Sequence, residues 1–229
     1  MKTIGLIGGM SAASTLIYYR TFCDLTRARL GGLHSPDLLI RSVDFAPIAA
    51  LQAQGAWDAL GKILDGHAHQ LAQCGAELIV LATNTMHKLA EPMMAGIDIP
   101  LVHIADATAR AVRAAGHSRP GLMATAFTME QDFYTARLRA CGLDPVIPDT
   151  NDRATTHRII YEELCRDIMT APSRTAFEEI AGRLAAAGAD SLILGCTEVG
   201  MLLNAENVPV PVFDTVAIHC ATALELALS

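Results

Sequence analysis

Aromatic residues make up only 5% of this 229-residue chain, and none of its six cysteines lies in a CxxC pair. The cysteines also lack a ligand-like spacing with the eight histidines, so the sequence predicts neither a zinc site nor an iron–sulfur cluster. Basic residues are outnumbered, and a formal net charge of −7 argues against nucleic acid or an anionic membrane as a partner. No apolar run approaches the length of a membrane span, and no signal-peptide pattern precedes the first strand. We therefore expect a reduced, cytoplasmic protein.

Hydrophobic residues are abundant, at 52%, and they occur as short runs that alternate with helical periodicities. This alternation predicts right-handed βαβ crossovers and an α/β fold, in which ligands bind beyond the carboxyl ends of parallel strands. Strands are predicted at residues 3–7, 38–43, 77–82, 101–104, 121–124, 191–195 and 210–213. Helices are predicted at residues 14–30, 57–74, 105–115, 129–141, 152–169, 174–187 and 214–228.

Two segments of the chain repeat one pattern at a constant offset. Residues 75–84 and 188–197 each consist of a Gly-Ala turn, an apolar run too short for a helix, and a small polar residue that opens a helix. Such a run is typical of a buried parallel strand that delivers one side chain to its carboxyl end. Two further pairs of segments parallel each other in the same chain order, residues 4–7 with 120–123 and residues 99–102 with 210–213.

The repeat predicts two α/β halves related by a pseudo-twofold axis, each with three layers and a parallel sheet. The first half is expected to comprise residues 1–103 plus 214–229, and the second half residues 104–213. Thr83 and Cys196 should then face each other, and the active site should lie in the cleft between the halves.

Cys196 is the strongest candidate for chemistry, because it follows an apolar strand and precedes Thr197-Glu198, which is typical of a helix start. The N–H groups and dipole of a helix N-terminus lower a thiol pKa from its free value of ~8.5. Glu198 then positions the sulfur or accepts its proton. The alternative is a small cysteine that fills space in the core, as we expect for the other five cysteines.

Thr83 occupies the equivalent position in the first half. Its alcohol is about as weak an acid as water, with a pKa of ~15.7, so it donates or relays a proton rather than standing as an alkoxide. A helix N-cap is the alternative role for Thr83. Asn84 and Thr85 add donors that suit a carboxylate at a helix N-terminus. His87, one turn further on, faces either the cleft or solvent.

Other polar residues follow the predicted strands. Ser11, after the pair Gly8-Gly9, offers a hydroxyl and an amide to a carboxylate, unless the segment is a plain turn. Asp44 is either a base or orienting partner, or the cap of a helix. Thr125 is the counterpart of the Gly8-Gly9 loop in the second half and a possible donor to the ligand. Arg166, on the predicted helix 152–169, is considered because an acidic ligand needs a cation.

Together these motifs resemble the PLP-independent aspartate/glutamate racemases of the Asp/Glu/hydantoin racemase superfamily. The resemblance runs along essentially the whole chain. It implies two Rossmann-like halves with the active site between them, often in a homodimer, and two opposed acid/base residues that are normally both cysteine. The motifs that carry it are Ile4-Gly5-Leu6-Ile7-Gly8-Gly9-Met10-Ser11, Ser42-Val43-Asp44-Phe45, Thr83-Asn84-Thr85-Met86-His87, Thr128-Met129-Glu130-Gln131-Asp132-Phe133-Tyr134 and Gly195-Cys196-Thr197-Glu198.

By this resemblance Cys196 is the second catalytic thiol, and Thr83 stands where the first thiol usually lies. Asp44 and Glu198 would support the acid/base chemistry. Gln52 sits where some relatives carry an arginine that contacts the substrate, and Arg166 lies roughly where a lysine does. The full set implied to bind the substrate is Met10, Ser11, Gln52, Asn84, Thr85, Thr125, Arg166 and Thr197.

The resemblance implies an isomerase that racemises aspartate or glutamate, and so forms a D-amino acid, with no cofactor and no metal. Each acid or base of such a pair typically contributes roughly 10²–10⁴-fold to the reaction rate. A hydroxyl in place of one thiol therefore predicts kinetic asymmetry between the enantiomers. The expected partner is a small acidic amino acid. Two alternatives stay open: a single-thiol decarboxylase or cis–trans isomerase of a small dicarboxylate, and a non-catalytic acidic amino-acid binder.

Overall fold

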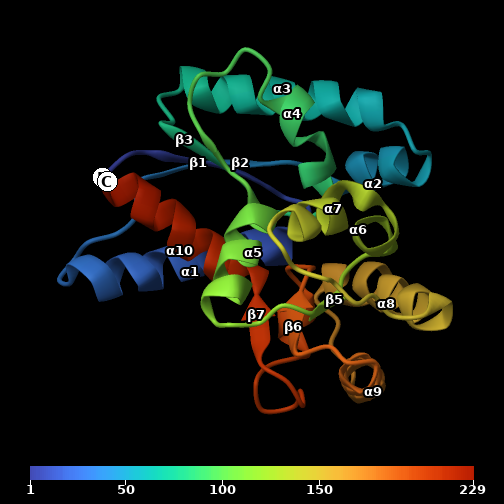
Figure 1. The fold of residues 1–229 in the computed structure, drawn as a ribbon. Helices are drawn as coiled ribbons and strands as arrows, with labels where there is room; N and C mark the ends of the chain where they lie inside the picture. The colour runs from blue at the N-terminus through green and yellow to red at the C-terminus, as the bar shows by residue number, and fades with distance from the viewer. The chain divides into compact units, whose positions relative to one another are not determined.

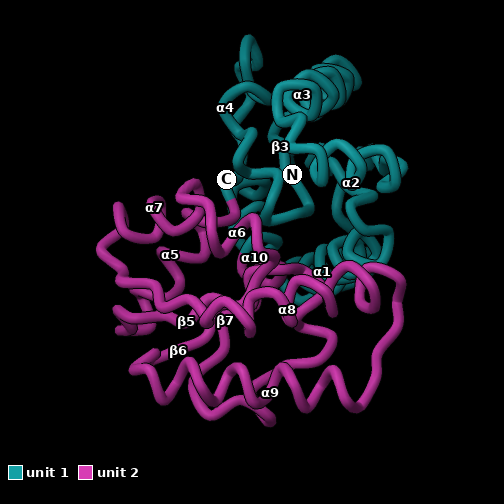
Figure 2. The backbone as a smooth tube through the Cα atoms, turned by 90° about the vertical axis from the view of Figure 1, so that its right-hand side faces the viewer, with its two compact units in different colours: residues 1–103, 219–229 teal, residues 104–218 magenta.

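The computed structural model describes residues 1–229, and it has the predicted α/β fold with two parallel sheets (Figure 1). The chain divides into two compact units, residues 1–103 with 219–229 (unit 1) and residues 104–218 (unit 2), which Figure 2 shows in teal and magenta. All seven predicted strands form. No helix combines the length and apolar character that a bilayer crossing requires.

Unit 1 contains a four-stranded parallel sheet in the order β2-β1-β3-β4. Its central strands are buried along their whole length, as their apolar sequences predict. The strands are β1 (Ile4–Gly8), β2 (Leu38–Ser42), β3 (Leu78–Leu81) and β4 (Leu101–Val102). The helices are α1 (Ala12–Leu30), α2 (Phe45–Ala53), α3 (Trp57–Gln73), the 3₁₀ helix η1 (Thr85–Leu89), α4 (Ala90–Met93) and most of α10 (Thr215–Leu228).

Helices cover both faces of this sheet, with α3 on one side and α1 on the other (Figure 1). The buried residues of α3 recur every three or four positions, which places them on one stripe of the helix. Within α1, Tyr18 and Phe22 are four residues apart and fully buried. Buried side chains thus cover both faces of the sheet.

Unit 2 contains a three-stranded parallel sheet in the order β5-β6-β7, and Val146 adds one bridge beside β5. The strands are β5 (Pro120–Met123), β6 (Ser191–Leu194) and β7 (Val212–Asp214). The helices are α5 (Ile104–Ala114), α6 (Ala126–Glu130), α7 (Asp132–Ala140), α8 (Thr150–Glu162), the 3₁₀ helix η2 (Leu164–Arg166), α9 (Ala171–Ala186) and the 3₁₀ helix η3 (Val199–Met201).

Side chains of this sheet alternate between two cores. Leu192 and Leu194 pack in one cluster with residues of α8 and α9, whereas Leu122 and Ile193 pack in another with residues of α5 and α7. This period of two is what a strand buried on both faces requires. The sheet of unit 2 is therefore also the middle of three layers.

The sequence repeat corresponds to equivalent places in the two sheets. The paired segments form β1 and β5, β3 and β6, and β4 and β7, which are adjacent in the same order. Gly75 and Gly188 end the helices before β3 and β6 with φ of 99° and 93°, a conformation that favours glycine. Each following alanine donates its N–H to a carbonyl in the last turn of that helix.

Several helix boundaries differ from the sequence prediction. The predicted helix 129–141 is interrupted at Gln131, whose extended backbone separates α6 from α7. The predicted helix 152–169 ends at Glu162, and Asp167 then adopts a left-handed conformation with φ of 59°. Helix α2 was not predicted, and Pro47 is tolerated in it because it lies in the first turn, where a backbone N–H has no partner within the helix.

Candidate active site

Cys196 lies at the carboxyl end of β6 in unit 2, where Gly195 ends the strand. The Gly195 N–H donates to Met123 O at 2.7 Å, which keeps the chain in the ladder up to that point. A Cβ atom on Gly195 would lie 2.6 Å from Leu122 Cδ1 and 3.0 Å from Ala124 Cβ, so a larger residue here would force its neighbours to shift. Cys196 is 9% exposed and is the next residue. The strand therefore delivers the thiol to its end, as predicted.

The Cys196 thiol is hydrogen-bonded to the buried carboxylate of Glu198. Cys196 Sγ donates to Glu198 Oε2 at 2.9 Å, and Thr197 Oγ1 donates to the same oxygen at 2.5 Å. The other oxygen, Oε1, lies 3.8 Å from Cys165 Sγ, which comes from η2. Glu198 is only 2% exposed. The Glu198 carboxylate is thus placed to accept the Cys196 proton. Such a transfer would move the negative charge from the carboxylate to the sulfur.

The pKa of the Cys196 thiol is raised well above its ordinary value, first by burial and then by the neighbouring Glu198 and Cys165. This corrects the expectation that a helix N-terminus lowers it. The helix that follows is η3, three residues in length, so few N–H groups are aligned toward the sulfur. Burial and the carboxylate dominate, and both favour the neutral thiol.

Thr83 lies at the equivalent corner of unit 1, at the carboxyl end of β3. Ala82 N–H donates to Ile7 O at 2.9 Å, as Gly195 does to Met123, and Thr83 N–H donates to Leu81 O at 2.8 Å. Thr83 caps no helix, because η1 begins at Thr85 and its flanking residue Asn84 makes no side-chain capping bond. The capping alternative for Thr83 is therefore wrong, and its side chain, 8% exposed, has no role in helix initiation.

His87 is 3% exposed, so the alternative that it faces solvent is wrong. Its Nδ1 donates to Thr83 O at 2.7 Å, which ties η1 back to the end of β3. Burial, together with the nearby rings of His103 and His219, lowers the pKa of His87 well below its ordinary value. Asn84 and Thr85, the predicted carboxylate donors between Thr83 and His87, are also buried.

The loop after β1 carries Met10 and Ser11, which are 5% and 2% exposed. Ser11 Oγ accepts from Ser14 N at 3.2 Å and so caps α1. Thr15 Oγ1 accepts from Gly9 N at 2.7 Å and donates to Ser11 O at 2.9 Å. These bonds fix the loop at the same end of the sheet as Thr83.

The remaining predicted residues of unit 1 lie on or beside α2. Asp44 is exposed, and its Oδ1 accepts from Ala46 N at 3.2 Å as the N-cap of α2, which supports the capping alternative. Gln52 is 3% exposed, and its amide nitrogen lies 3.9 Å from Met86 Sδ on η1. Gln52 is therefore close to the Thr83 corner, whereas Asp44 has a structural role at the helix entry.

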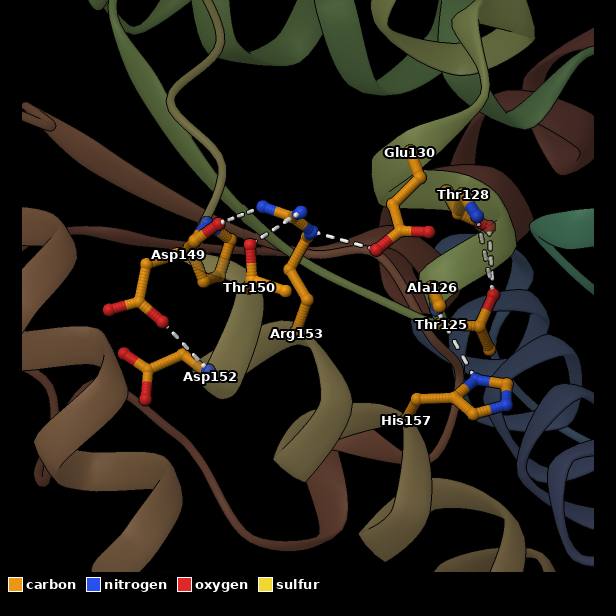
Figure 3. A network of polar contacts seen from close by, with 10 residues as sticks. Thr125, Ala126, Thr128, Glu130, Asp149, Thr150, Asp152, Arg153 and His157 are labelled. Atoms are coloured by element: carbon orange, nitrogen blue, oxygen red, sulfur yellow. Dashed lines mark hydrogen bonds and ion pairs between the residues drawn. The ribbon is translucent and has the colours of Figure 1, made fainter.

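Thr125 lies at the end of β5 in unit 2 and caps α6 (Figure 3). Its Oγ1 accepts from Thr128 N at 3.4 Å and lies 3.2 Å from Thr128 Oγ1. The next N–H, of Ala126, donates to His157 Nδ1 at 3.3 Å. Arg153 Nε donates to Glu130 Oε1 at 2.8 Å, so helix α8 braces the short helix α6 at both ends.

Arg166 does not lie on a long helix as predicted, because α8 ends earlier and Arg166 falls in η2. Its side chain is exposed, and it follows Cys165, which contacts Glu198. The structure thus brings Cys196, Thr197 and Glu198 into one contact group in unit 2, with Thr83, Asn84 and Thr85 in one corner of unit 1. No group of three or more His, Cys, Asp or Glu side chains is arranged to hold a metal ion.

The sequence pattern of the Asp/Glu/hydantoin racemase family matches residues 7–223. The chain belongs to this family. A crystal structure of a candidate Asp/Glu racemase from Yersinia pestis is 47% identical, with a TM-score of 0.91 and full coverage of both chains. The structure of PH1733, an aspartate racemase homologue from Pyrococcus horikoshii, is 34% identical, with a TM-score of 0.86 and full coverage of both. The broad specificity amino-acid racemase RacX of Bacillus subtilis is 24% identical over 93% of each chain.

In this racemase-family chain, sequence reasoning missed several residues that contact the predicted ones. Cys165 was assigned to the core, yet its thiol points toward Glu198. His103 and His219 were not singled out, although their rings pack near His87. No local signal marks these residues, because each is brought to its site from a distant segment of the chain.

Proposed function

We propose that this protein racemises aspartate, glutamate or both without a cofactor, by exchanging the proton at Cα. The observation that carries the proposal is the thiol of Cys196, held on the buried carboxylate of Glu198 at the end of a strand. A thiol paired with a proton acceptor is the arrangement that proton abstraction from carbon requires. Family membership and the racemases among its relatives support the same reaction.

In the proposed mechanism, Glu198 accepts the Cys196 proton and the resulting thiolate removes the α-proton from one face of the substrate. Thr83 returns a proton to the opposite face. Since the Thr83 alcohol has a pKa of ~15.7, it hands on a proton that it receives at the same time, from a relayed water, and never stands as an alkoxide. A hydroxyl is a poor base, so abstraction of the α-proton by Thr83 from the other enantiomer is slow.

Donors near the strand ends are proposed to hold the substrate carboxylates and to stabilise the charge that develops on the carbanion. The net charge of −7 repels an acidic substrate, so these local donors must outweigh it. The proposed set is Met10, Ser11, Gln52, Asn84, Thr85, Thr125, Arg166 and Thr197. A homodimer stays a prediction from the resemblance, and a cytoplasmic location stays a prediction from the sequence.

The deciding experiment follows deuterium uptake at Cα from heavy water, for each enantiomer of aspartate and glutamate. We expect Cys196→Ala to lower uptake by at least about 10²-fold. Cys74→Ala, at an exposed cysteine that ends α3, is the matched control and should behave like the unsubstituted protein. Comparable exchange by Cys196→Ala would end the proposal.

The asymmetry proposed for Thr83 concerns rates only. The equilibrium constant of a racemisation is unity, so both enantiomers must reach the same mixture at long times. Initial rates from pure L and pure D substrate, compared at saturation, measure the asymmetry directly.

A second candidate function is favoured by the presence of a thiol at only one of the two corners. A single-thiol enzyme of this kind would protonate an enolate after decarboxylation, or add to a double bond in cis–trans isomerisation. Release of carbon dioxide from a malonate, or conversion of maleate, would support it. Tight binding of an acidic amino acid without any proton exchange would instead favour the third alternative, a binding protein.

A further inference from the structure

Three histidines and a tyrosine from four distant segments form a buried cluster next to Thr83 in unit 1. His87 lies on η1, His103 follows β4, His219 lies on α10, and Tyr18 lies on α1. His219 and Tyr18 are fully buried, and the other two rings are 3% and 9% exposed. The ring centroids of His87 and His103 are 4.5 Å apart, and those of His87 and His219 are 5.7 Å apart. Burying three imidazoles and a hydroxyl costs free energy unless their polar atoms are hydrogen-bonded.

Two hydrogen bonds to backbone carbonyls fix the protons of the cluster. A carbonyl oxygen only accepts, so His87 carries its proton on Nδ1, which donates to Thr83 O at 2.7 Å. His219 carries its proton on Nε2, which donates to Val102 O at 2.7 Å. Nδ1 of His219 is then an acceptor, and the Tyr18 hydroxyl donates to it at 2.8 Å. The two imidazoles therefore have opposite tautomers in fixed orientations.

The bond from His87 fixes the peptide plane between Thr83 and Asn84. This peptide is trans, so the N–H of Asn84 points to the opposite side from the Thr83 carbonyl. By holding the carbonyl, His87 sets the direction of that N–H and the orientation of the Thr83 Cα, from which the side chain with its hydroxyl projects. These are the groups that the proposed function uses to hold a carboxylate and to return a proton.

We infer that His87 is a positioning residue that holds the Thr83 corner in its working geometry and acts through the Thr83 carbonyl. The inference rests on the proposed racemase function. His103 and His219 pack against the His87 ring, and Tyr18 and Val102 anchor His219 at both nitrogens. The order of the cluster thereby reaches the hydrogen bond from His87 to Thr83 O at the end of β3.

Two substitutions of His87 separate this role from general packing. In His87→Asn the amide N–H lies near the position of Nδ1, whereas in His87→Gln it lies near Nε2. We expect His87→Asn to retain inversion within about tenfold, and His87→Gln to lower it about 100-fold, because misplacement by about 1 Å has that cost. Exchange at the Cys196 face without inversion should stay within a few-fold in both variants.

The ratio of inversion to exchange is the informative readout, since general damage to packing lowers both. His69→Asn and His69→Gln, on the partly exposed surface of α3, are matched controls that should leave the ratio unchanged. Equal ratios in His87→Gln and the unsubstituted protein would overturn the positioning role. If the unsubstituted protein exchanges no α-proton, the proposed function fails and the positioning role fails with it.

Histidine ¹⁵N NMR of the unsubstituted protein tests the geometry without any variant. We expect the Nδ1–H tautomer for His87 and the Nε2–H tautomer for His219, with the assignments made from single His→Gln variants. A His87 ring that carries its proton on Nε2 at neutral pH does not donate to Thr83, and this result would also overturn the inference.

Discussion

At the end of β3, His87 donates a hydrogen bond to the backbone carbonyl of Thr83, whose side chain is a hydroxyl. At the end of β6, the thiol of Cys196 donates a hydrogen bond to the carboxylate of Glu198. The backbone bonds that lead into the two corners are the same, from Ala82 to Ile7 and from Gly195 to Met123. The repeated scaffold therefore sets where the side chains lie. The residues that follow each corner decide what those side chains can do.

The partners of the two corners are complementary. In the aligned repeats Glu198 stands opposite Thr85, and His87 stands opposite Gly200. The carboxylate can take a proton from sulfur, which suits abstraction. The imidazole instead fixes backbone, which suits a hydroxyl that only relays protons. Under the proposed function, the repeated corner carries a proton acceptor beside the reactive side chain in unit 2 and a backbone-fixing imidazole in unit 1.

Glu198→Gln should break the Cys196 corner with the largest effect. The amide keeps the size of the side chain but removes the proton acceptor, so we expect α-proton exchange to fall by about 10³-fold. The pKa of Cys196 should fall at the same time, because the neighbouring negative charge raises it in the unsubstituted protein. Alkylation of Cys196 by iodoacetamide at pH 8, followed by mass spectrometry, should accordingly speed up.

Slower exchange with faster alkylation is a combination that simple damage to the fold does not produce. Glu206→Gln, at an exposed position, is the matched control. Unchanged exchange in Glu198→Gln would show that the carboxylate takes no part in the reaction.

Acid and alkali should destabilise different units. Burial lowers the pKa of His219 to about 4, and lowers that of His87 well below 6.5, so unfolded histidines bind protons that the folded ones refuse. This stability is present above pH 6.5 and is lost as pH falls toward 4, by about 3 kcal/mol for His219 alone. Urea unfolding followed by fluorescence of Trp57, the one tryptophan of the chain, reports it in unit 1.

In unit 2 burial raises the pKa of Cys196, Cys165 and Tyr161. Their contribution is present below the pKa values of the unfolded groups and is lost as pH rises above about 9. His219→Gln should flatten the acid side of the profile and leave the alkaline side alone. An unchanged acid side in that variant would contradict the assignment.

Thr83→Cys should make the two corners more alike. A second thiol exchanges protons with carbon more readily than a hydroxyl, so we expect kcat/KM to rise by about 10²-fold for both enantiomers, because an equilibrium constant of unity keeps the two values equal. The rate at saturation should rise most for the slower enantiomer. Initial rates from pure L and pure D substrate measure this change. No gain for either enantiomer would mean that Thr83 takes no part in the proton transfer. Thr83→Val, which keeps the shape without the hydroxyl, is the control.

Asp44→Ala should have the smallest effect and tests which role Asp44 has. Loss of the N-cap of α2 should cost about 1 kcal/mol of stability, measured by urea unfolding. Asp44→Asn retains a capping oxygen and should be close to neutral. A loss of exchange in both variants, without loss of stability, would instead assign Asp44 to the acid/base chemistry.

The strand pattern and the repeat could be predicted because they depend on local sequence. Apolar runs bounded by Gly-Ala turns identify β3 and β6, and family motifs cover the same segments. The break at Gln131 and the early end of α8 were missed, since periodicity continues across both. The burial of His87 was left open, because one turn of sequence does not show which side of the corner is covered.

By itself, the sequence determined the α/β fold, the parallel sheets and the family, since these depend on period, spacing and motif. Only the tertiary structure decided the environment of each reactive group. The pKa of Cys196 is raised because the chain buries the thiol and folds Glu198 back onto it, and His87 donates to Thr83 within a cluster that joins α1, η1 and α10. Proton affinities depend on burial and on neighbours a few ångströms away, and those neighbours come from parts of the chain that local patterns do not connect.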